Sequence, residues 1–160
     1  MIAAAALVLA AACSRSASLP ADSAPARPAA TGPRIVLPDG YAVRVEIAAD
    51  DPTREQGLMF RDRLADDRGM IFFFAQKGVY SFWMKNTLIP LDMTWIDGDR
   101  KVVFVATDVP PCQADPCPSY GPTKEEALYV LETAPGVMKK HGVAVGSTLK
   151  LEGLDQGIGR

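Results

Sequence analysis

The chain has 160 residues, of which 48% are hydrophobic and 22% are charged, and its formal net charge is -2. This apolar content is too high for a disordered chain, and the length favours one domain with a single hydrophobic core. Because the chain has no basic excess, nucleic-acid binding is not expected.

The N-terminus resembles a bacterial export signal. Small and apolar residues run unbroken from Ile2 to Ala12 and end at Cys13, which is too short a run to cross a bilayer core. The stretch Leu9–Cys13 resembles a lipobox, although its leucine lies one position early and no Lys or Arg precedes the run. We expect a signal peptide over residues 1–12 and lipidation of Cys13; an ordinary signal peptide cleaved near Cys13 is the alternative.

Residues 13–33 are predicted to form a solvated tether. Four prolines and many Ser and Ala residues leave almost no large apolar side chain to offset the ordering entropy by burial. Ser14, following Cys13, resembles the sorting signal of lipoproteins that reach the outer membrane. We therefore expect the protein to lie on the periplasmic face of the bacterial outer membrane.

Residues 34–153 are predicted to form one β-rich domain, with a C-terminal tail over residues 154–160. Apolar residues alternate with polar ones from Tyr41 to Ile47, as in a strand with one buried face. Asp51 as N-cap and proline at the first helical position then predict a short helix that extends to about Phe60. We expect this helix to turn Leu58 and Met59 inward.

The middle of the domain is predicted to consist of strands. The apolar run Met70–Phe74 indicates a central strand buried on both faces. Ala75–Gly78 is predicted as a turn, and Val79–Met84 as the hairpin partner. Leu91–Ile96 and Lys101–Ala106 form a second predicted hairpin across an Asp-Gly-Asp turn.

A proline-rich loop over residues 107–122 contains the other two cysteines, Cys112 and Cys117. If Cys13 carries lipid, this pair is even and close in sequence, which predicts a structural disulfide in an oxidising compartment. A redox or metal site is the alternative, but the spacing is not Cys-x-x-Cys and no second Cys pair or His cluster completes a zinc set.

The C-terminal part is predicted to hold a strand over Leu128–Leu131 and a short helix over Pro135–His141. Gly142 follows that helix in the position of a left-handed C-cap, and Thr148–Glu152 closes the domain as a last strand. About seven short strands and two short helices predict a mainly β fold, either a β-sandwich or a partly open barrel.

From about Ile35 to Leu151 the chain resembles the domain of unknown function 192 family. The resemblance rests on these segments: Glu55–Arg61, Gly69–Phe72, Phe82–Asp92, Tyr129–Glu132 and Gly142–Gly146. It implies a compact, jelly-roll-like β domain that is often exported. It implies no activity, since the family has no established function.

The segment Phe82–Asp92 carries the candidate site. In an extended segment Phe82 and Met84 face one way, and Trp83 and Lys85 face the other, so an aromatic ring lies beside a cation. We predict a polar cluster lined by Trp83 that binds a small polar or glycan ligand; its members are Arg61, Lys85, Asn86 and Asp92. In the alternative, Asn86 and Asp92 bond turn backbone and the segment only specifies the fold.

Enzymatic readings find less support in the sequence. His141 is the only histidine, and no Gly-x-Ser-x-Gly motif is present. A glycosidase could pair Asp92 with Glu132 or Glu55, but no spacing selects a pair. Thioether ligation of copper is the other candidate, although four of five methionines lie in apolar patterns typical of a core; the five are Met59, Met70, Met84, Met93 and Met138.

The sequence therefore favours a non-enzymatic, envelope-anchored module that binds a glycan, a small polar ligand or a protein partner. No cofactor, metal or nucleic acid is expected. A structural or assembly protein of the envelope is one alternative. The other is an enzyme that acts on an envelope carbohydrate or peptide with Asp92 and Lys85.

Overall fold

The computed structural model describes residues 32–154. The predicted signal peptide, Cys13, all but the end of the tether and the tail beyond residue 154 lie outside the described residues. Within residues 32–154, no helix has the length and hydropathy needed to cross a membrane.

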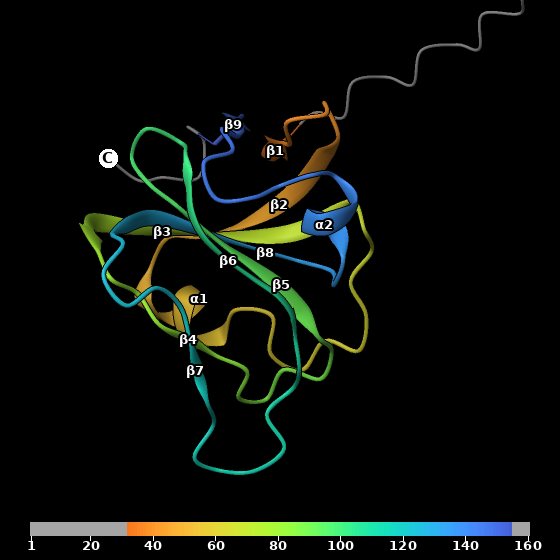
Figure 1. Ribbon diagram of the computed structural model, residues 1–160. Coiled ribbons are helices and arrows are strands. Elements are labelled where there is room, and N and C mark those ends of the chain that lie inside the picture. Colours follow the sequence, from red (N-terminus) through yellow and green to blue (C-terminus); the bar gives the residue numbers. More distant parts are fainter. Residues whose placement is uncertain (1–31, 155–160) are drawn as a thin grey trace, which may run out of the picture. The chain divides into compact units, whose positions relative to one another are not determined.

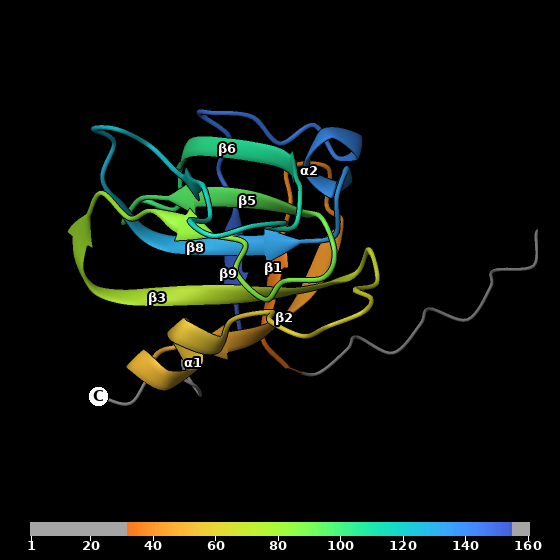
Figure 2. The same ribbon diagram turned by 90° about the horizontal axis from the view of Figure 1, so that it is seen from below.

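The described chain forms a seven-stranded sheet in the order β6-β5-β8-β3-β2-β1-β9 (Figures 1 and 2). Its neighbours are antiparallel except β2 and β3, which are parallel. The strands are β1 (Arg34–Val36), β2 (Ala42–Ala48), β3 (Arg68–Gly78), β5 (Leu91–Ile96), β6 (Val102–Val109), β8 (Ala127–Thr133) and β9 (Lys150–Glu152). A second, two-stranded sheet pairs β4 (Phe82–Trp83) with β7 (Ser119–Tyr120). The helices are α1 (Asp51–Gln56) and α2 (Val137–Lys140).

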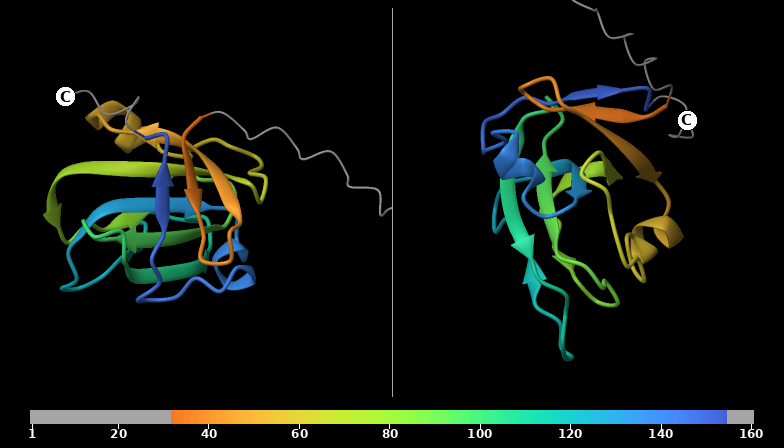
Figure 3. Two further views of the ribbon diagram at one scale, coloured as in Figure 1. Left: turned by 90° about the horizontal axis from the view of Figure 1, so that it is seen from above. Right: turned by 90° about the vertical axis from the view of Figure 1, so that its right-hand side faces the viewer.

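The sheet curls into a half-barrel. β1 and β9 cross over the strands of the other half, as Figure 3 shows. At one end its two edges meet, because Lys101 bridges Thr148 and the amide of Val102 donates to the Ser147 carbonyl at 2.8 Å. The prediction of a mainly β fold with two short helices is therefore confirmed, and the partly open barrel is the form that the chain adopts.

The strands bury side chains on both faces. In β3, Ile71 and Phe73 join the apolar residues enclosed by the curled sheet and α2, which we call the inner cluster. Met70 and Phe72 join the apolar residues on the other face, which we call the outer cluster. The alternation explains why the run over residues 70–74 is continuously apolar, since both faces exclude water.

Helix α1 begins and ends earlier than the sequence pattern predicted. Asp50, not Asp51, is the N-cap: its carboxylate accepts from the amide of Thr53 at 2.8 Å in a capping box. The helix ends at Gln56 because Gly57, with φ of 48°, turns the chain beside the ring of Phe72. Leu58 is buried as expected.

The hairpin predicted over residues 70–84 is wrong. β3 continues through Gly78, which pairs with Ala127 of β8 after a register shift, so residues 75–78 are strand and not turn. The chain then reverses at Tyr80, whose ring stacks on Phe74 with centroids 3.6 Å apart. β4 pairs instead with β7, so that Trp83 is opposite Ser119, a residue 36 positions later in the chain.

The later elements agree better with the prediction. β5 and β6 form the expected hairpin, with β6 extended to Val109. Cys112 and Cys117 form a disulfide. α2 is followed by Gly142 with φ of 65°, as expected for its end.

Candidate functional site

An open groove of about 1120 Å³ lies between α1 and the segment around β4. Two stretches of the sequence line it, one from each side. The first contains α1 and the two residues Met59 and Phe60; the second runs from Tyr80 to Asn86. We call it the aromatic groove, and its lining residues are Asp51, Pro52, Arg54, Glu55, Gln56, Met59, Phe60, Phe74, Tyr80, Ser81, Phe82, Trp83, Lys85 and Asn86.

Strand alternation in β4 presents an aromatic ring to the groove. Phe82 turns inward and packs edge-on against Phe72 and Trp95, with centroids 4.9 and 5.8 Å away. Trp83 faces outward and is 52% exposed, and Lys85 Nζ lies 5.5 Å from its ring centroid. The arrangement of a ring beside a cation is the one expected from the sequence, and it leaves the indole available to a ligand.

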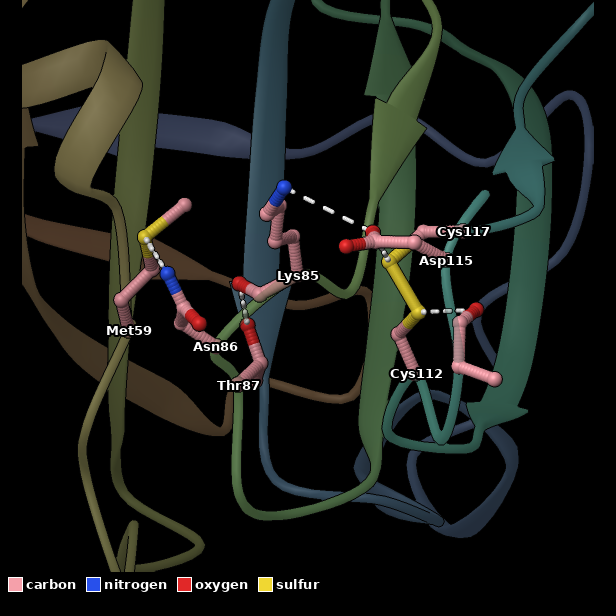
Figure 4. Close-up of a disulfide and its surroundings, with 8 residues drawn as sticks. Met59, Lys85, Asn86, Thr87, Cys112, Asp115 and Cys117 are labelled. Atoms are coloured by element: carbon pink, nitrogen blue, oxygen red, sulfur yellow. Dashed lines mark hydrogen bonds and ion pairs between the residues drawn. A yellow bond between two sulfur atoms is a disulfide. The ribbon is translucent and has the colours of Figure 1, made fainter.

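The two walls of the groove are joined at a strained position. Phe60 and Asn86 both have positive φ, 63° and 56°, which is uncommon for residues other than glycine. The amide of Phe60 donates to the Asn86 carbonyl at 2.8 Å, and Asn86 Nδ2 approaches Met59 Sδ at 3.8 Å (Figure 4). Phe60 is 68% exposed, so burial does not compensate its strain. Such strain clusters at functional sites.

The disulfide loop supports the second wall. Lys85 Nζ lies 3.5 Å from a carboxylate oxygen of Asp115, which sits between the two cysteines in sequence (Figure 4). The amide of Cys112 donates to the Met84 carbonyl at 3.3 Å. The disulfide therefore holds a loop that in turn positions the cation beside Trp83.

Polar groups of both signs lie around the aromatic rings. Arg54 is held by the carbonyls of Ala49 and Phe73 at 2.6 and 2.9 Å and by Asp51. Glu55 and Gln56 are exposed at the rim. Together with Lys85 and Asn86 they offer a carboxylate, two amides and an ammonium, which can bond hydroxyl groups from several directions.

Of the five predicted site residues, the structure brings Trp83, Lys85 and Asn86 together at the groove. Asp92 lies elsewhere: it is fully buried, and its carboxylate accepts from the amides of Asp108 and Met138 at 2.8 and 3.0 Å. It therefore fixes the first turn of α2 on the inner face and does not face Lys85.

Arg61 also lies outside the lining of the aromatic groove. Its guanidinium donates two hydrogen bonds to the carboxylate of Glu46, at 2.5 and 2.7 Å. This pairing lowers the pKa of Glu46 below its ordinary value. The only histidine is occupied as well, since His141 Nδ1 lies 2.7 Å from Asp39 and its ring stacks on Tyr41.

Glu132, which the sequence offers only as one possible carboxylate partner of Asp92, lies in an unusual environment. It is 4% exposed, and desolvation raises its pKa to about 8. The register places it between Met70 and Met93 on the outer face, and its Oε2 has no hydrogen-bond partner among residues 32–154. The signal in the sequence is an acid within the apolar strand Tyr-Val-Leu-Glu.

The pairs considered for carboxylate chemistry are not assembled. Asp92 and Glu132 lie on opposite faces of the sheet, because Asp92 is opposite Thr133 in the register and Glu132 is opposite Met93. Glu55 is exposed on α1. Within the described range no group of three His, Cys, Asp or Glu side chains is placed to hold a metal ion.

Comparisons with known proteins place these features in a wider group. The DUF192 family model, described as an uncharacterised group, matches residues 34–151. A crystal structure from Sinorhizobium meliloti 1021, provisionally described as a transcription regulator, is 35% identical with a TM-score of 0.66, over 76% of this chain and 93% of that one. A protein of unknown function from Novosphingobium aromaticivorans DSM 12444 is 30% identical with a TM-score of 0.66, over 74% and 82%. No curated protein matches the chain.

Proposed function

The chain belongs to the DUF192 family, which is uncharacterised, so family membership assigns no activity. From the geometry we propose that it is a non-enzymatic module that binds a glycan in the aromatic groove. The observation that carries the proposal is the exposed indole of Trp83 beside Lys85 in an open groove rimmed by amides and a carboxylate. An aromatic face suits the apolar face of a sugar ring, and the polar rim suits its hydroxyls.

The conformational strain at the groove supports the same proposal. A bulky residue with positive φ and an exposed side chain lowers stability without a packing gain. Phe60 has both properties, and it meets Asn86 where the two walls join. A contact to a ligand is a reason to keep an aromatic ring at such a position.

We further propose that the domain works in the bacterial envelope, tethered through a lipid on Cys13. The apolar run before Cys13 and the Ser/Ala/Pro-rich segment over residues 14–33 support this proposal. The Cys112–Cys117 disulfide supports it too, because disulfides persist in oxidising compartments. Cell-wall glycan is then the class of ligand within reach.

The test is a fluorescence titration with soluble cell-wall disaccharide fragments and N-acetylglucosamine oligomers. The protein is the 160-residue chain with Cys13→Ser, so that it is purified without lipid. Trp83 is 52% exposed and Trp95 is fully buried, so an emission change reports on the groove. We expect a saturable change whose affinity Asn86→Ala weakens by about tenfold or more, as for contacts at the centre of a binding site. Trp83→Ala removes the reporter itself, so that variant is compared by the ligand-induced shift in its thermal melt, which should be lost.

Val145→Ala is the matched control, because Val145 is 66% exposed and lies outside the groove lining. At a hundred times the dissociation constant, a ligand adds about 2.7 kcal/mol to the unfolding free energy, so thermal melts give a second readout. No saturable change with any glycan, an equal affinity in Asn86→Ala, or an equal thermal shift in Trp83→Ala would overturn the proposal.

A further inference from the structure

A second pocket, of about 440 Å³, has four arginines among its eleven lining residues. It lies at the start of β2 and β3 and under the segment that joins α1 to β3. Its charged lining is Arg44, Glu46, Arg61, Arg63 and Arg68, and its other lining residues are Gly32, Pro33, Val45, Leu64, Ala65 and Gly69. We call it the arginine pocket; it shares no lining residue with the aromatic groove.

The sheet places two of these cations side by side. Arg44 of β2 is opposite Arg68 of β3 in the parallel register, so both side chains leave the same face on adjacent strands. Like charges directly opposite each other destabilise a sheet. Asp67 reduces the repulsion, because it accepts from Arg44 and lies 3.9 Å from Arg68.

The acids near the pocket do not neutralise it. Glu46 is fully used by Arg61, and Asp67 is used mainly by Arg44. Counting the two acids that contact these arginines, two positive charges remain among the four arginines. Arg63 is exposed and has no hydrogen bond or ion pair within residues 32–154. The side chain of Arg68 is 52% exposed; it lies 3.9 Å from Asp67, and its charge helps to lower the pKa of Glu46.

We propose that the arginine pocket binds a phosphate group. The guanidinium fork matches phosphate oxygens with two parallel hydrogen bonds, and Arg stays charged at any physiological pH. A phosphate monoester carries a charge of about -1.5 to -2 at pH 7, which matches the two unbalanced cations. Arg63 and Arg68 supply these two cations. Glu46 balances the charge of Arg61 and holds its guanidinium in place, so Arg61 offers the pocket its remaining N–H donors.

Two sources of phosphate are within reach of the pocket. Gly32 and Pro33, where the chain enters the domain, form part of its lining. The 20 residues from Ser14 to Pro33 span at most about 70 Å, so a domain anchored at Cys13 could reach a phospholipid headgroup as well as a soluble phosphate ester. Both present the same chemistry to the arginines.

The experiment titrates the full chain carrying Cys13→Ser with inorganic phosphate at pH 7 by calorimetry. In parallel it measures cosedimentation with phosphatidylcholine vesicles with and without phosphatidic acid. We expect saturable binding that Arg63→Gln weakens about three- to fivefold, the size of one exposed charge pair, and that Arg63→Gln/Arg68→Gln weakens more than tenfold. Arg63→Lys should retain part of the affinity, because it keeps the charge and loses the fork.

Lys124→Gln is the matched control. It removes one positive charge from a side chain that is 84% exposed and lies outside the pocket, in the loop that leads into β8. Melting temperatures of all variants check that the exposed substitutions leave the fold intact. Binding of phosphate alone identifies a soluble ester, and vesicle binding that phosphate competes away identifies a headgroup; both support the pocket. No binding to either, or affinity that Arg63→Gln/Arg68→Gln does not change, overturns it.

Discussion

The two faces of the central sheet treat their buried acids in opposite ways. On the inner face, Asp92 has both carboxylate oxygens bonded to backbone amides, one of them in α2. On the outer face, Glu132 is opposite Met93, the residue that follows Asp92, and opposite Met70 on its other side. Its Oε2 has no hydrogen-bond partner among residues 32–154. The inner face therefore satisfies the carboxylate of Asp92, although the hydroxyl of Thr94 on the same face has no partner among residues 32–154, whereas the outer face holds a buried carboxyl group that lowers stability.

The same contrast extends to the backbone and the surface. Phe60, whose positive φ is strained, donates its amide hydrogen to Asn86 where the two walls of the aromatic groove meet. These walls are carried by α1 and β4, which lie on the same side of the sheet (Figure 1). The inner cluster is enclosed by the curled sheet and α2. Natural proteins keep locally unfavourable features mainly where function requires them. The difference teaches that the least favourable acid and the strained Phe60 both lie on the side of the sheet that carries the aromatic groove, which is the side for which we propose binding.

The largest expected effect is the pH dependence that Glu132 confers. Its pKa is raised from 4.5 to about 8 by burial. Below pH 4.5 both the folded and the unfolded chain hold the proton, so the group has no effect on stability. As pH rises towards 8 the unfolded chain loses the proton first, so stability falls, by about 4–5 kcal/mol once pH exceeds 8.

Glu132→Gln should remove this loss, so the difference in unfolding free energy between variant and native chain should grow from pH 4 to pH 9. Urea unfolding at both values measures it. Glu55→Gln, at an exposed position, is the control and should not change the pH slope. Parallel pH profiles for the native chain and Glu132→Gln would contradict the assignment.

The second effect tests the hydrogen-bonded carboxylate of Asp92 on the inner face. Asp92→Ala leaves the buried amide of Met138 and the partly buried amide of Asp108 without their acceptor, and should lower the unfolding free energy by about 3 kcal/mol. Urea unfolding at pH 7 measures the loss. Asp62→Ala, at an exposed acid, should stay within about 0.5 kcal/mol. A change below 1 kcal/mol for Asp92→Ala would show that the two faces do not differ in this way.

The smallest effect tests the strain at the groove. Phe60→Asn places a residue that tolerates positive φ at an exposed site, so stability should rise by about 0.5–1 kcal/mol while glycan binding is lost. Thermal melts and the fluorescence titration measure the two outcomes. Leu88→Asn is the control, because Leu88 is 58% exposed without a positive φ and should gain no stability. If Phe60→Asn lowered stability, the positive φ of Phe60 would not be a source of strain, and the comparison of the two faces would lose this observation.

Local patterns in the sequence were sufficient for the elements whose partners are close in the chain. The Asp-Gly-Asp turn predicted the β5–β6 hairpin, and the spacing of Cys112 and Cys117 predicted their disulfide. The pairing of β4 with β7 was missed, because the local pattern of Ala75–Gly78 indicates a turn, whereas in the structure β3 continues to Gly78 and pairs there with β8. Non-local pairing leaves no local signal.

The candidate site shows the same limit. The alternation in Phe82–Lys85 predicted the ring beside the cation, which adjacent residues of one strand bring together. The sequence could not show that α1 and Phe60 form the opposite wall, that Asp92 turns to α2, or that Arg44 and Arg68 meet across two strands. Each of these depends on the register between segments that are distant in the sequence.

The meeting of the two sheet edges has a consequence for how the domain associates with other chains. The hydrogen bonds from Val102 to Ser147 and from Leu149 to Arg100 occupy backbone groups that an open sheet would present along its margin. An unprotected margin recruits further strands, which leads to strand addition by partners and to fibrillar self-association. At this end of the half-barrel the chain is its own partner, so recognition there falls to side chains and the backbone is protected from templated aggregation.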